Sequence, residues 1–99
     1  MAIASGRLGE LANGSIVITL AYNDANNAVQ SATVANNSPY MAEFTVWLTA
    51  DPTNRRMVSV PPLTTQTFTT IPAGTRYSPV ELAPTDPRAT NFDWSFRTL

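Results

Sequence analysis

The chain offers few side chains that catalyse reactions at neutral pH. Its 99 residues include no histidine, no cysteine and no lysine. Schemes that pair serine or cysteine with histidine, or that form a lysine Schiff base, need one of these residue types. The sequence excludes them and leaves only carboxylates and arginines for chemistry.

The carboxylates are scattered along the chain, and no two have the spacing that would place them together on one strand face for glycoside hydrolysis. The segment 23–27 has one Asp among three Asn, which indicates a turn better than a calcium loop. The four glycines form no nucleotide-binding spacing. We therefore expect no enzyme, no catalytic residue, no metal site and no cofactor. The carboxylates are Glu10, Asp24, Glu43, Asp51, Glu81, Asp86 and Asp93.

The charge balance indicates what the protein does not bind. The net charge is −1, all six cations are arginine, and only Arg55 and Arg56 are adjacent. No basic patch for nucleic acid follows from this balance. No apolar run is long enough to span a membrane, and the first residues lack the pattern of an export signal. We expect a soluble protein that binds neither nucleic acid nor membranes.

The polar residues are mainly Thr, Ser and Asn, and only 13% of the chain is charged, which favours strands over helices. Short alternating segments separated by Asn, Pro and Gly turns predict an all-β fold. We expect a small antiparallel β-sandwich, an immunoglobulin-like Greek key, with a small jelly roll or barrel as second choice. Residues 1–13 are interpreted as an N-terminal arm and 14–99 as one domain. The expected strands are 15–22, 28–35, 43–49, 57–60, 64–71 and 91–98.

Alternation within 43–49 assigns Phe44, Val46 and Leu48 to the core and turns Trp47 to the opposite face. Residues 51–54 are expected to form a turn. The stretch 77–90 contains three prolines, which fit a long loop or an edge.

The last segment alternates aromatic and polar residues, so that its aromatic side chains share one face. This face could be core, an interface or a ligand platform. Both chain ends could be completed by a neighbouring subunit, which favours a homo-oligomer. The interface candidates are Ile3, Leu8, Leu11, Trp47, Phe92, Trp94 and Phe96.

Three segments resemble small β-sandwich virion proteins of tailed bacteriophages. They are the run 13–22, the segment 34–38 with its two asparagines, and the Val-Pro-Pro-Leu-Thr-Thr-Gln-Thr turn at 60–67, within a region of about 13–74. The resemblance implies a capsid decoration or tail accessory protein that binds a repeating capsid or tail protein in the virion, often as a symmetric trimer. It assigns no functional residue.

Two other classes remain open. One is a carbohydrate-binding or protein-binding β-sandwich module detached from a larger secreted enzyme. The lack of any linker composition in the chain argues against this class. The other is an enzyme inhibitor that would present a rigid loop such as 51–56.

Overall fold

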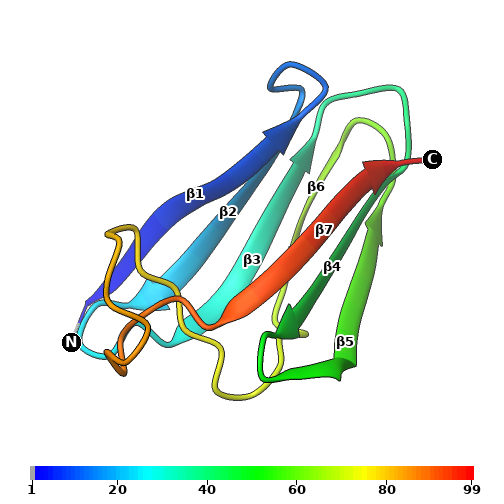
Figure 1. Cartoon of the computed structure of the whole chain (residues 1–99). Coiled ribbons are helices and arrows are strands. Elements are labelled where there is room, and N and C mark those ends of the chain that lie inside the picture. The colour runs from blue at the N-terminus through cyan, green and yellow to red at the C-terminus, as the bar shows by residue number, and fades with distance from the viewer. Residues whose placement is uncertain (1) are drawn as a thin grey trace.

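The computed structural model describes residues 2–99, and that range contains strands and no helix (Figure 1). The central strands follow alternating segments of the sequence, because they bury every second side chain. The strands are β1 (Ile3–Leu11), β2 (Ile16–Asn23), β3 (Val29–Asn36), β4 (Ala42–Leu48), β5 (Asp51–Val60), β6 (Thr64–Phe68) and β7 (Phe92–Thr98).

The strands form two antiparallel sheets that pack face to face, which confirms the expected all-β sandwich (Figure 1). One sheet has the order β1-β2-β3-β6 and the other β5-β4-β7. The chain leaves the first sheet after β3, returns to it with β6 beside β3, and crosses again to place β7 beside β4. In an immunoglobulin constant domain the fifth strand, not the third, lies beside the second. The strand order therefore differs from that domain while the layers are the same.

The core lies between the sheets and consists of alternate residues of the central strands. Ile16, Ile18 and Leu20 of β2 face Phe44 and Val46 of β4, and each is at most 3% exposed. Their alternation with half-buried residues gives the burial patterns of β2 and β4. Phe44 and Val46 lie in the core as expected, and Leu48 is half-buried at the end of β4.

Residues 3–11, expected as part of an arm outside the sandwich, instead form β1, which pairs with β2 along its length. The strand carries no alternating signal because its core side includes Gly6 and Gly9. The Tyr77 ring lies over Gly6 and the Trp94 ring over Gly9, where an added Cβ would be 2.9 and 2.7 Å from the nearest ring carbon. Rings from distant residues thus replace the missing side chains.

Residues 51–54, expected as a turn, instead begin β5, the longest strand. The chain reverses at Thr49 and Ala50, and Leu48 pairs with Asp51. Pro52 is compatible with a strand here because β5 is an edge strand, where one side needs no N–H donor. Strand β6 ends at Phe68, earlier than the expected 71.

One end of the sandwich is closed by the short β3–β4 and β5–β6 connections, at the top of Figure 1. Asn36 is fully buried there. Its Nδ2 lies 2.8, 3.0 and 3.1 Å from the carbonyl oxygens of Tyr40, Val60 and Pro61. Its Oδ1 accepts hydrogen bonds from the backbone N and the Oγ of Ser38. One side chain therefore joins the ends of strands from both sheets.

The opposite end is covered by the segment 69–91, which connects β6 to β7 (Figure 1). Arg76 bridges to Ala28, the residue before β3, and Tyr77 N donates to Asn27 O at 2.9 Å. Asn91 accepts from Arg76 N at 2.8 Å and donates to Gly74 O at 2.9 Å. The segment contains no strand, in agreement with the loop expected at 77–90.

Candidate interaction surfaces

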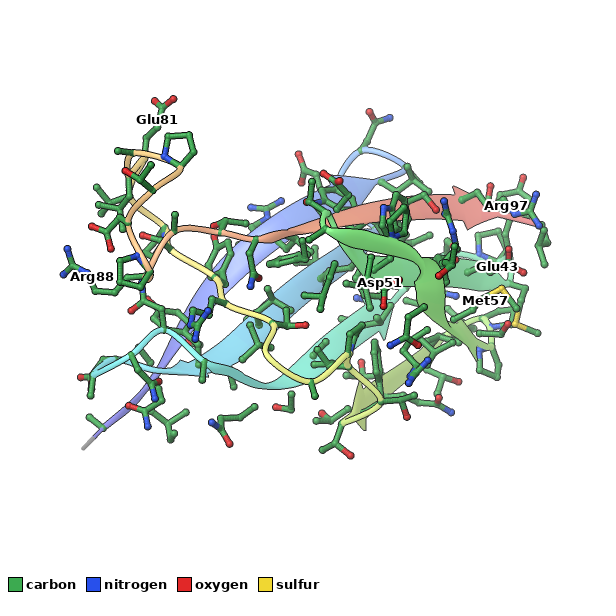
Figure 2. All side chains as sticks on the ribbon, turned by 60° about the horizontal axis from the view of Figure 1, so that its bottom comes forward. Glu43, Asp51, Met57, Glu81, Arg88 and Arg97 are labelled. Atoms are coloured by element: carbon green, nitrogen blue, oxygen red, sulfur yellow. The ribbon has the colours of Figure 1, made fainter. Side chains whose placement is uncertain are left out.

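The charged groups of residues 2–99 are dispersed over the surface, and no three His, Cys, Asp or Glu side chains come together in that range. Arg97 pairs with Glu43 at 2.7 Å across β7 and β4. Arg88 pairs with Asp86 at 3.0 Å within the loop, and Arg7 pairs with Glu10 on β1. Figure 2 places Glu43 and Arg97 at one end of the molecule and Glu81 and Arg88 at the other. The ion pairs of the described residues therefore lie apart from one another on the surface.

The aromatic stripe of β7 faces the core. Phe92, Trp94 and Phe96 pair in register with Leu48, Val46 and Phe44 of β4. Phe92 is buried at 5% exposure, whereas the other two are half-buried and pack against the core. Their ring centroids lie 6.3 and 6.2 Å from that of Phe44. The stripe is therefore part of the core, and Trp94 and Phe96 keep part of their apolar surface exposed.

The N-terminal candidates divide between two places on β1. Leu8 and Leu11 are partly buried and pack against the core, while Ile3 is 59% exposed near the start of the strand. Gly9 lies between the two leucines and contacts the Trp94 ring of the other sheet. We call Leu8, Leu11, Trp94 and Phe96 the β1–β7 seam, because they are half-buried apolar residues of the two strands that this contact joins.

Trp47 points away from the core on the central strand of the three-stranded sheet, as expected. The Arg55 guanidinium lies 4.0 Å from the centre of its ring, and such cation–π contacts stabilise by about 0.5–1 kcal/mol at exposed sites. Asp93 is its register partner on β7 and accepts a hydrogen bond from Thr49 Oγ1 at 3.0 Å. Trp47 is therefore separate from the β1–β7 seam and has charged neighbours on both sides.

The loop 69–91 is fixed to the sandwich by Tyr77. The Tyr77 ring meets that of Tyr22 edge-on at 5.6 Å, and its hydroxyl lies 3.4 Å from Arg7 O. Burial, and after it the neighbouring Tyr22, raises the pKa of Tyr77. The Arg88 side chain and then its backbone N–H donate to Asp86 and lower the pKa of that carboxyl. Val80, between Tyr77 and this ion pair in the sequence, is exposed.

Sequence reasoning did not single out the free edge of β6. Strand β6 is the outer strand of the four-stranded sheet, opposite β1, and Thr65, Gln66 and Thr67 are exposed. Thr67 shares a hydrogen bond of 2.8 Å with Thr33 of β3 through their hydroxyls. The threonine run was visible in the sequence, but its place at an edge depends on the return of the chain to β3.

No protein-family model, curated protein or solved structure matches the chain. In the range 2–99 no helix is long and apolar enough to cross a membrane.

Proposed function

We propose that the protein is a non-enzymatic structural component of a tailed-bacteriophage virion, which docks as a homo-oligomer on a repeating capsid or tail protein. The observation that carries the proposal is the β1–β7 seam. Its four apolar side chains lie between the sheets and stay half-buried in the single chain. The resemblance of residues 13–74 to small virion sandwiches supplies the class of partner.

The seam suits docking because a partner would complete the burial of side chains that the core already orients. Each further 100 Å² of apolar surface removed from water contributes about 2.5 kcal/mol. Trp94 and Phe96 are held by contacts with each other and with Phe44, so that little side-chain entropy is lost on binding. Copies arranged on a repeating lattice would add avidity to a modest single contact.

The test is mass spectrometry of purified phage particles whose genome encodes the chain. We expect the chain in a fixed ratio to the capsid or tail protein. We expect Leu8→Ser to reduce its retention on the particles and Val80→Ser, an exposed loop position outside the seam, to leave it unchanged. Absence of the chain from particles that contain both capsid and tail proteins would overturn the proposal.

A second candidate is a carbohydrate-binding module, favoured by the outward Trp47 between Arg55 and Asp93. An indole ring can stack on a sugar while neighbouring polar groups bond its hydroxyls. Because Arg55 covers one face of the ring, a sugar would use the other face or displace the guanidinium. Titration with oligosaccharides, followed by Trp fluorescence, should then give a saturable signal that Trp47→Ala removes and Trp94→Phe keeps.

A further inference from the structure

The four edge strands of the two sheets differ in how they are protected. The edges are β1 and β6 in one sheet and β5 and β7 in the other. An edge strand presents a row of unpaired N–H and C=O groups to any further strand, and natural proteins block such rows with charges, prolines or bulges. An edge that lacks all three is available for pairing.

Three of the four edges carry such protection. Strand β1 has a register shift between Arg7 and Gly9 and bears the Arg7–Glu10 ion pair. Strand β5 contains Pro52, and its Arg56 is paired in register with the buried Val46, which places a charge on the core side of the edge. Strand β7 carries Asp93 and Arg97 on its outer face.

Strand β6 has none of these features. The sequence contains no charged residue between Arg56 and Arg76, and β6 itself contains no proline. Its pairing with β3 is regular over all five residues. Within residues 2–99 the backbone of 65–68 makes no hydrogen bond outside that ladder. The outer side of β6 is therefore an open and uncharged strand edge.

We propose that two copies of this chain join through β6, which pairs antiparallel with β6 of the second copy and makes the two four-stranded sheets one continuous sheet. The register that pairs every residue of the strand places Gln66 opposite Gln66 of the second copy. It places Thr65 opposite Thr67 and Thr64 opposite Phe68. A two-fold axis relates the copies, as in most homodimers.

The second copy is the occupant that fits because the edge complements itself. Strand β6 is uncharged, so the pairing brings no like charges together. Threonine side chains directly opposite one another stabilise antiparallel strands. The Thr33–Thr67 hydroxyl pair already runs across the sheet to its edge, and Thr65 of the second copy would extend the row. Phe68, half-buried beside Phe44 at a centroid distance of 6.0 Å, would gain cover from the partner strand.

A ladder formed by one short strand from each copy is smaller than the interface of a permanent dimer. We therefore expect a reversible dimer with a dissociation constant on the order of 10–100 μM. This inference rests on the self-association in the proposed function and assigns it to β6. It is tested on the isolated protein, so that it can fail while the chain is still found in virions.

The first measurement is sedimentation equilibrium of the whole chain from about 5 μM to about 1 mM, a range that brackets that dissociation constant. We expect the average mass to rise from that of one chain toward that of two. In the same range, ¹⁵N-edited NMR spectra should show concentration-dependent amide shifts at 64–68 and not at β1 or β7. A single chain at every concentration, or shifts confined to other edges, would overturn the proposal.

The decisive variants place charges at the centre of the pairing. Gln66→Lys and Gln66→Glu should each raise the dissociation constant about fivefold or more, because like charges then lie directly opposite. An equimolar mixture of the two should restore dimers. Ser95→Lys, the matched charge at the β7 edge, should leave dimerisation unchanged. Equal dimerisation by wild type and both Gln66 variants would contradict the register, and the NMR dilution series decides the question if a variant does not fold.

Discussion

The two ends of the sandwich are each held by an asparagine, but in different surroundings. Asn36 is fully buried and joins strand ends of both sheets through five contacts. Asn91 is half-exposed and fixes the loop 69–91 through Arg76 and Gly74. The Asn36 side chain is itself out of reach of water, so a replacement there leaves buried polar groups without partners, whereas at the looped end water can replace a lost hydrogen bond. Burial therefore decides how much the same residue type contributes.

The connections at the two ends of the sandwich also differ in length. The buried end uses two short connections, and the looped end uses more than twenty residues, among which Ile71, Pro72 and Tyr77 supply apolar contacts. A long connection spreads its anchors over several weak contacts, so that single changes cost less. The predictions below run from the buried end to the surface of the loop.

Asn36→Asp should have the largest effect. A carboxylate cannot donate to the carbonyls of Tyr40, Val60 and Pro61, and it buries a charge. We expect the free energy of unfolding to fall by about 3–5 kcal/mol in urea titrations at pH 7. Compared with wild type at the same pH, the loss should be smaller at pH 4, where a protonated carboxyl is neutral and donates one bond. Asn37→Asp, an exposed neighbour, is the control, and equal losses for the two would refute the role of burial.

Tyr77→Ala should cost about 2 kcal/mol, because it removes a half-buried ring from Gly6 and Tyr22. Tyr77→Phe should cost less than about 1 kcal/mol, since the hydroxyl contact to Arg7 O is long. The raised pKa of Tyr77 means that the native state holds this proton longer than the unfolded state. Its contribution is present below pH about 10 and is lost as pH rises further, so Tyr77→Phe should flatten the alkaline stability profile. An unchanged profile would show that other groups govern it.

Asn91→Asp should cost about 1 kcal/mol, clearly less than Asn36→Asp. The new side chain keeps an acceptor for Arg76 N and loses only the donation to Gly74 O. Thermal unfolding of both variants in one buffer measures the contrast directly. If Asn91→Asp were as damaging as Asn36→Asp, the loop would be as integral to the sandwich as the buried corner.

Arg88→Ala should have the smallest effect on stability, because its ion pair with Asp86 is at the surface of the loop. The pKa of Asp86 should rise toward its ordinary value when the guanidinium is removed, and the backbone N–H at position 88 should keep part of the shift. A lowered pKa contributes stability that is lost as pH falls, so wild type should lose slightly more than the variant on acidification. Carboxyl ¹³C titration by NMR measures the shift, and an unchanged Asp86 titration would contradict the pairing.

Much of the fold could be predicted from local patterns. Strands β2, β3, β4 and β7 lie within one or two residues of the alternating segments, because side chains that alternate along a strand alternate between core and surroundings. Strand β1 could not be predicted in this way, since Gly6 and Gly9 leave no side chains to alternate. The start of β5 was hidden by Pro52, which is a turn signal in a hairpin and acceptable in an edge strand.

The features of the candidate surfaces also divide into those that local patterns predict and those that depend on distant pairings. The outward position of Trp47 and the shared face of Phe92, Trp94 and Phe96 follow from alternation alone. The contact between Gly9 and Trp94 and the open edge of β6 depend on pairings between residues far apart in the chain. No local pattern encodes them.

The sequence by itself determined that the chain is all-β and that it lacks the residue types for histidine, cysteine or lysine chemistry, because strand periodicity and residue type are local properties. Tertiary structure alone decided that Asn36 is buried while Asn91 is half-exposed, that two glycines lie under aromatic rings, and that β6 is an unprotected edge. Each of these depends on which segment, distant in the chain, lies beside a residue. The strand order within each sheet and the packing of the two sheets decide this.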